Sequence, residues 1–133
     1  MPTRQARYDA TVRHLRDQGR RSWDPVKGVC MYRAPDGCMC AIGPMIPDAL
    51  YDPSMESIGV SRLVQNPELQ SALLGGDGMS SLGFLMALQM THDDPKNWSE
   101  NRGMTRRMLN RLREIAMLNG LSDAALADVE CVA

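Results

Sequence analysis

The chain has 133 residues, 15 basic and 16 acidic side chains, and a formal net charge of −1. This length predicts one domain spanning residues 1–133, because single domains most often contain about 100–150 residues. No apolar run approaches the roughly 18–20 residues that a membrane span needs, and the N-terminal segment lacks the apolar stretch of a signal peptide. We therefore expect a cytosolic protein that does not insert into a membrane.

Charge is distributed unevenly along the chain. Residues 1–33 hold eight basic and three acidic groups, residues 34–100 hold two and nine, and residues 101–133 hold five and four. This pattern is typical of a fold whose basic helices lie against an acidic middle, and it can also steer a charged partner. Arginine outnumbers lysine thirteen to two, which suits bidentate pairing with carboxylates or phosphates.

The N-terminal segment, residues 3–18, is predicted to form the first long helix. Tyr8, Val12 and Leu15 recur on one stripe of this helix, and Gly19 supplies a stop signal after it. Arginine side chains occupy much of the remaining surface.

A β-hairpin is predicted after a polar connection over residues 20–27 that carries Trp23. The sequence Ala34-Pro35-Asp36-Gly37 fits a type I turn with glycine in the left-handed position. That turn pairs a strand at about residues 29–33 with one at about 38–42. One face of the hairpin then carries Cys30, Tyr32, Cys38, Cys40 and Ile42. Because a two-stranded hairpin is not stable alone, helices must cover at least one of its faces.

Proline and glycine divide the middle of the chain into short elements. A short helix is expected at residues 60–64. Asn66 followed by Pro67 is typical of an N-cap and a first helical position, and it opens a helix to about Leu74. The glycines at 75–78 predict a flexible break.

Two further long helices complete the prediction. Residues 80–91 carry a broad apolar surface, which predicts the central and most buried helix. Residues 105–119 form the third long helix, and Ser122 caps a last helix over residues 123–131. The expected fold is a helix-dominated α+β domain, with three long helices and several short ones packed on the single β-hairpin.

The four cysteines do not have the spacing of a zinc knuckle. Cys30, Cys38 and Cys40 follow a C-x7-C-x-C pattern, whereas zinc sites favour two cysteines separated by two to four residues. In the predicted register Cys30 and Cys38 lie roughly 13 Å apart, too far to share one ion. We expect reduced, buried thiols and no cofactor or bound metal. A metal site aided by His92 or Cys131, and a redox role, are the alternatives.

His92 and Asp93 suggest an alternative function, that of a metal-dependent hydrolase or nuclease. All-helical phosphohydrolases of the His-Asp type hold metal with a histidine, a His-Asp dyad and a later aspartate. His14, His92-Asp93 and Asp123 or Asp128 reproduce that order. A histidine near the C-terminus of a helix is, however, expected from the helix dipole alone. We assemble no other catalytic set from the sequence and expect a protein that is not an enzyme.

Direct nucleic-acid binding through the Arg-rich helices is a second alternative. Arginines cluster within residues 4–21 and 106–113, and the two groups form one phosphate-contacting face if their helices lie side by side. A dedicated nucleic-acid-binding domain is usually strongly basic, whereas the isoelectric point of this chain is about 6.1.

Short motifs between residues 28 and 98 resemble a group of small uncharacterised proteins of tailed bacteriophages and prophages. The motifs are Gly28-Val29-Cys30-Met31-Tyr32-Arg33, Asp36-Gly37, Cys40-Ala41-Ile42-Gly43, Ile46-Pro47-Asp48, Tyr51-Asp52-Pro53-Ser54-Met55-Glu56, Leu88-Gln89, His92-Asp93 and Trp98. Ser57 departs from the pattern, which continues with glycine. The resemblance brings no activity and no catalytic residue. It implies a phage accessory protein in the cytosol of an infected bacterium.

The same stretch supplies the candidate partner-binding residues. Aromatic and arginine side chains beside acidic groups are typical of binding surfaces, and Asp48, Asp52 and Glu56 are expected to form an exposed acidic rim. The full candidate set is Tyr32, Arg33, Asp36, Asp48, Tyr51, Asp52, Glu56, His92, Asp93 and Trp98. The expected function is that of a phage-encoded, non-enzymatic protein that binds and modulates a host protein or host defence complex. Its most specific form is counter-defence, including anti-CRISPR inhibition by an acidic surface that mimics nucleic acid.

Overall fold

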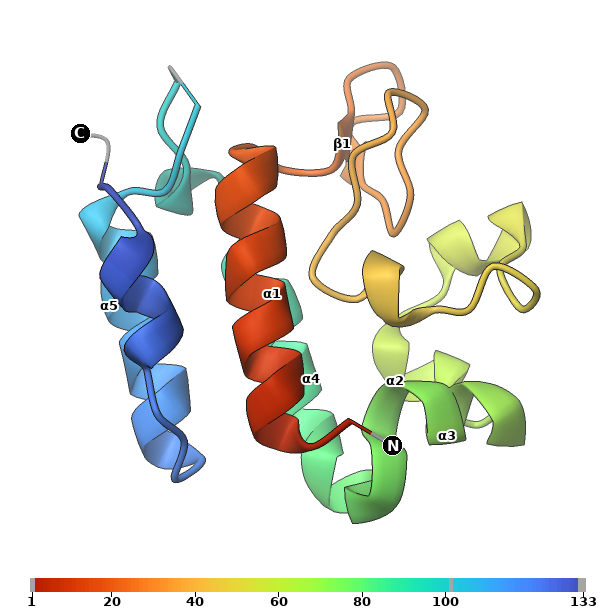
Figure 1. Ribbon diagram of the computed structural model, residues 1–133. Coiled ribbons are helices and arrows are strands. Elements are labelled where there is room, and N and C mark those ends of the chain that lie inside the picture. The colour runs from red at the N-terminus through yellow and green to blue at the C-terminus, as the bar shows by residue number, and fades with distance from the viewer. Residues whose placement is uncertain (1, 101, 132–133) are drawn as a thin grey trace.

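Three long helices frame the structure, a computed structural model that describes residues 2–100 and 102–131 (Figure 1). They are α1 (Arg4–Gln18), α4 (Leu82–Asp93) and α5 (Arg106–Leu118). Two short helices, α2 (Val60–Leu63) and α3 (Pro67–Leu74), and a small antiparallel sheet accompany them. The predicted helix-dominated α+β fold is confirmed.

Local side-chain signals set the helix ends, as the sequence predicts. The Thr3 hydroxyl accepts a hydrogen bond from the Ala6 N–H at 3.1 Å and starts α1, and Gly19 ends this helix in the left-handed conformation with φ 71°. The Asn66 side chain caps α3 in the same way by accepting the Glu68 N–H at 2.9 Å. These caps involve only neighbouring residues, which explains why the helix bounds were predictable.

Two segments differ from the sequence prediction. The glycines at 75–78 do not form a flexible break but belong to a 3-10 segment, Gly75–Ser81, which joins α3 to α4 and bends at Gly78 with φ 58°. The last helix, expected over residues 123–131, is a shorter 3-10 turn, Ala124–Asp128. Leu126 anchors this turn by packing into the helical core, so a longer helix is not needed to hold the segment.

The strand pairing also differs from the predicted hairpin. Strand β1 (Trp23–Asp24) pairs antiparallel with β2 (Val29–Cys30), and the Ser22 carbonyl accepts the Met31 N–H at 3.0 Å. The beginning of the predicted strand 29–33 is therefore paired with the segment before it. Residues 20–27, which the sequence predicts as a polar connection, thus contain β1, one strand of the sheet.

The turn of the predicted hairpin is correct. The Ala34 N–H donates to the Cys38 carbonyl at 2.8 Å and the Cys40 N–H donates to the Tyr32 carbonyl at 3.3 Å, as the predicted register requires. The residues predicted to share one face of the hairpin, however, do not all pack together. Tyr32 and Cys40 pack in one hydrophobic core, whereas Cys38 packs with Met31 in a separate small cluster.

Helix α4 contributes to two hydrophobic cores. Phe84 and Leu88 pack with residues of α1 and α5 in the first core. Leu85 packs in the second core, which is formed with α3 and with residues 32–64. Figure 1 shows α1 between α5 on one side and this second layer of short elements on the other. The predicted central position of this helix is confirmed by its packing.

The stretch Pro67–Asp93 is long and apolar enough, by length and composition alone, to cross a membrane. It is not one straight helix, because it comprises α3, the 3-10 segment and α4, with non-helical backbone angles at Gly78. Leu73 and Leu85 of this stretch are fully buried inside the protein. Core packing therefore accounts for part of its apolar character, whereas Met79, Met86 and Met90 are exposed.

Gly43 should be the glycine least tolerant of a side chain. A Cβ atom at Gly43 would overlap the Tyr32 carbonyl oxygen and lie 3.0 Å from Met39 Cβ. We expect Gly43→Ala to lower the free energy of unfolding by about 1–3 kcal/mol, the usual cost of overpacking. Gly83→Ala is the control, because a Cβ there meets nothing within 4 Å and alanine favours the helix by up to about 1 kcal/mol. Urea unfolding measures both, and equal stabilities would contradict the packing described.

Candidate functional site

Both tryptophans of the chain line one surface cleft of about 530 Å³. Trp23 comes from β1 and Trp98 from the loop after α4, and Arg20, Arg21 and Asp36 are also part of the lining. We call this site the tryptophan cleft. Its volume lies within the range of ligand-binding sites in proteins.

One wall of the tryptophan cleft is an arginine–tryptophan stack. The Arg21 guanidinium carbon lies 4.3 Å from the centre of the Trp23 ring, within the distance of a cation–π interaction. The same guanidinium donates to the Asp93 backbone carbonyl at 3.4 Å. The stack is therefore held against the C-terminal end of α4.

The rim of the tryptophan cleft carries an ion pair. Arg20 lies 3.0 Å from the Asp36 carboxylate and also donates to the Cys38 sulfur at 3.1 Å. The Cys38 backbone N–H, together with the Arg20 charge, lowers the pKa of Asp36 below its ordinary value. Positive and negative groups thus stand side by side at the mouth.

His92 supports the tryptophan cleft from behind. Its imidazole is fully buried, and Nε2 accepts the Ser22 N–H at 2.9 Å while Nδ1 lies 2.7 Å from Asp93 Oδ1. Because a backbone N–H can only donate, Nε2 must carry the lone pair and Nδ1 the proton. The His92 carbonyl accepts the Trp98 indole N–H at 2.9 Å. One residue thus connects the β1 segment, α4 and the Trp98 loop.

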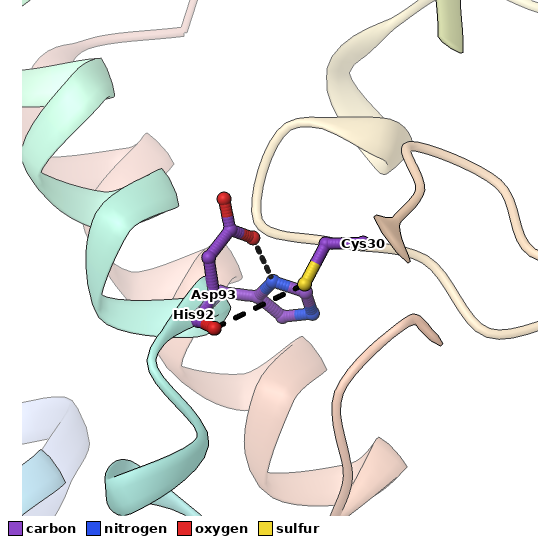
Figure 2. A group of neighbouring side chains, drawn as sticks. All are labelled: Cys30, His92 and Asp93. Atoms are coloured by element: carbon purple, nitrogen blue, oxygen red, sulfur yellow. Dashed lines mark hydrogen bonds and ion pairs between the residues drawn. The ribbon is translucent and has the colours of Figure 1, made fainter. Parts of the chain in front are cut away.

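The same histidine belongs to a cluster with the composition of a metal site (Figure 2). Ligand atoms of Cys30, His92 and Asp93 lie within 4.8 Å of one another. Both imidazole nitrogens are already engaged, however, by Ser22 and Asp93. Burial and the Asp93 charge raise the pKa of the Cys30 thiol to about 11, so that it is neutral at pH 7 and donates weakly to the Asp93 carbonyl at 3.9 Å. Because both imidazole nitrogens are engaged, the cluster forms a hydrogen-bonded connection between β2 and the end of α4.

The other members of the His-Asp metal set are not brought to this cluster. His14 bonds through Nε2 to the Met39 carbonyl at 2.9 Å, and Asp123 lies 3.9 Å from Arg113. Within residues 2–100 and 102–131, the structure assembles only Cys30, His92 and Asp93 as a group of three possible ligands.

A second group of predicted site residues surrounds Glu56. The Glu56 carboxylate accepts the backbone N–H groups of Tyr32 at 2.7 Å and Arg33 at 3.1 Å, and the Tyr51 hydroxyl at 2.5 Å. Burial and this carboxylate raise the pKa of Tyr51 to about 12. Glu56 therefore holds the loop after β2 in place, which differs from the exposed rim position expected from the sequence.

The other two acids of the predicted rim have different positions. Asp48 pairs with Arg33 at 2.8 Å, and its side chain is 92% exposed. Asp52 accepts the Ser54 N–H at 2.9 Å and caps the 3-10 segment Pro53–Ser57. Arg33 also lies over the Tyr51 ring, 4.6 Å from its centre. Asp48, Arg33 and Tyr51 form a surface cluster of arginine, aromatic and acid.

The predicted site residues therefore lie in two places. Asp36 and Trp98 line the tryptophan cleft, with His92 and Asp93 behind it, whereas Tyr32, Arg33, Asp48, Tyr51, Asp52 and Glu56 surround the loop after β2. A shallow depression of about 280 Å³ between them is lined by Cys30, Tyr32, Glu56 and Asp93. Sequence reasoning gave Trp23 no site role, and it assigned Arg20 and Arg21 only to the alternative phosphate-contacting face. The Arg-x-Trp spacing within the polar connection was the available signal.

Comparison with models of protein families, with curated proteins and with solved structures finds no match to this chain. The resemblance to bacteriophage accessory proteins therefore stays a prediction.

Removing the Glu56 carboxylate should destabilise the fold far more than removing that of Asp48. Glu56→Ala takes the acceptor from two backbone N–H groups and one hydroxyl, and we expect a loss of about 2–4 kcal/mol in unfolding free energy. Asp48→Ala breaks one exposed ion pair, which should cost at most about 1 kcal/mol. Equal losses in thermal or urea unfolding would show that Glu56 is not a structural acceptor.

Cys30 should react slowly with iodoacetamide unless the pH is high. With the pKa raised to about 11, the thiolate fraction, and with it the alkylation rate, should rise about tenfold per pH unit between pH 7 and 10. The exposed Cys131 is the internal reference. A metal centre would bind the thiolate, so Zn²⁺ that abolished Cys30 labelling, or a chelator that lowered the melting temperature, would contradict the hydrogen-bonded assignment.

Proposed function

We propose that this protein is a small phage-encoded interaction protein that binds a host protein through the tryptophan cleft and catalyses no reaction. The observation that carries the proposal is the placement of both tryptophans and the stacked Arg21 around one cleft of about 530 Å³. Tryptophan and arginine are the residues most enriched among those that dominate binding energy in protein interfaces.

The chemistry of the tryptophan cleft favours a protein segment as its occupant. Trp23 and Trp98 offer apolar faces, while Arg20, Arg21 and Asp36 offer both signs of charge. A peptide segment with an apolar side chain between polar groups can use all of these contacts. A purely anionic ligand would meet the Asp36 carboxylate at the rim.

The surface pair of Arg33 and Tyr51 supports a second contact with the same partner. The Arg33 guanidinium lies over the Tyr51 ring and also forms an ion pair with the exposed Asp48 carboxylate. Counter-defence inhibition of a host defence complex, including the anti-CRISPR form, remains the most specific version of this proposal. It is supported by the resemblance to phage proteins and by the acidic balance of residues 34–100.

The two alternatives have weaker support. For a metal-dependent hydrolase, His92 would have to exchange the Ser22 or Asp93 hydrogen bond for the metal. For a nucleic-acid-binding protein, many arginines of α1 and α5 are already paired with acidic or polar side chains. These are Arg4, Arg16, Arg107, Arg111 and Arg113.

The proposal predicts that partner recovery depends on Trp23. Tagged wild-type protein, Trp23→Ala and Met117→Ala are used to capture proteins from bacterial lysate, with quantification by mass spectrometry. Met117 is the control because it is an exposed apolar side chain on α5 outside the tryptophan cleft. We expect a partner retained by wild type and Met117→Ala and reduced at least tenfold by Trp23→Ala. Identical recovery by all three, or no partner at physiological salt, would contradict the proposal.

A further inference from the structure

A second cavity, of about 310 Å³, lies between α1, residues 41–45 and α3. Its walls are mostly small or apolar, with Ala10 on α1, Ala41 and Met45 on the loop, and Ala72 on α3. Arg7 and Thr11, four residues apart on α1, are polar members of its lining. Residues with this separation lie on one face of a helix. The cavity is separate from the tryptophan cleft.

Arg7 is a buried cation without a paired carboxylate. Its residue exposure is 7%, and its guanidinium donates to the Leu73 carbonyl. No ion pair of Arg7 occurs within the part of the chain that the structure describes, and the nearby Asp77 pairs instead with Arg4 at 3.7 Å. Burial lowers the pKa of Arg7, against the opposing charge of Asp77. A guanidinium has five N–H donors, and the Leu73 carbonyl engages one of its nitrogens, Nη1.

Gly75 makes room for this guanidinium. A Cβ atom at Gly75 would lie 2.8 Å from the terminal nitrogen of Arg7, and the residue has a φ of +65°. The position therefore favours glycine twice, through its backbone angle and through the space that Arg7 occupies. The buried arginine is thus accommodated by the surrounding chain.

Thr11 places an unsatisfied hydroxyl beside Arg7. The residue is 3% exposed, and its Oγ1 has no hydrogen-bond partner among the described residues. Thr91 provides a comparison within the same protein, because its hydroxyl donates to the Ala87 carbonyl one turn earlier at 2.8 Å. A buried helical threonine ordinarily makes that bond. The Thr11 hydroxyl makes no such bond and is enclosed by neighbouring atoms, although the residue itself is part of the cavity lining.

We propose that this cavity binds a small organic carboxylate, with the charged end on Arg7 and the apolar body against the alanines and Met45. Arginine holds carboxylates through two parallel N–H bonds. The volume is at the lower end of the range for ligand sites. A short acyl or aryl carboxylate therefore fits, and a nucleotide or a long-chain lipid does not.

The experiment compares octanoate with 1-octanol by isothermal titration calorimetry on the full chain. We expect octanoate to bind in a saturable manner with one site and at least tenfold more tightly than the neutral alcohol, because only the carboxylate can pair with Arg7. Equal affinities would show that the apolar walls alone bind, and no octanoate binding would overturn the proposal directly.

Ala10→Phe tests the location of the site without touching Arg7. Ala10 is exposed on α1 and lines the cavity, so a phenyl ring there should block octanoate while the melting temperature changes little. The control is Ala127→Phe, at an exposed position that does not line the cavity. Octanoate binding that survives Ala10→Phe would place the ligand elsewhere and refute the assignment.

Thr11→Val tests whether Arg7 binds the carboxylate without the neighbouring hydroxyl. Valine replaces a buried, unsatisfied hydroxyl, so the melting temperature of the free protein should rise by about 2–5 °C, while octanoate affinity should be unchanged because the enclosed hydroxyl does not reach the ligand. Thr91→Val, which breaks an existing hydrogen bond, should lower the melting temperature and also leave octanoate binding unchanged. An octanoate affinity that fell with Thr11→Val alone would place the carboxylate on Thr11 and contradict its assignment to Arg7.

Discussion

The arrangement of this protein around its tryptophan cleft depends on one buried imidazole. His92 lies at the C-terminal end of α4, the helix that packs in both hydrophobic cores. Through its two ring nitrogens and its carbonyl oxygen it bonds to Ser22, Asp93 and Trp98. A buried imidazole is costly unless both nitrogens have partners, so the three segments must meet in a single arrangement. The positions of both tryptophans follow from that requirement.

The helices could be predicted because the interactions that define them are local. Thr3, Gly19 and Asn66 act on backbone groups within a few residues, and the turn after Ala34 closes through its own neighbours. The predicted strand pairing is correct next to its turn, where Tyr32 and Ala34 bond to Cys40 and Cys38, but it does not include the pairing of β2 with β1. The Met31 N–H points away from residues 38–42 and bonds to Ser22, and strand periodicity and turn residues do not indicate which segment lies on that side.

The candidate site was predictable only in part, for a related reason. Asp36 and Trp98 belong to the motifs that resemble phage proteins, whereas the sequence predicts only a polar connection around Trp23. Its role arises from the bond between Ser22 and His92, seventy residues apart in the chain. Glu56 is a second example of a long-range interaction. An acid in a proline-rich segment suggests exposure, yet its carboxylate accepts the backbone N–H groups of Tyr32 and Arg33 from an earlier segment of the chain. Long-range hydrogen bonds to the backbone leave little trace in sequence patterns.

The location of both tryptophans in one cleft has a spectroscopic consequence. Indole emission from this protein arises entirely from Trp23 and Trp98, so the whole signal originates at the candidate binding site. Arg21 lies over one indole, and the His92 ring lies 6.1 Å from the other at 77°. One fluorophore therefore stacks on a residue that lines the cleft, and the other neighbours the histidine behind it. The protein carries an intrinsic optical reporter whose intensity and wavelength follow the state of this single surface.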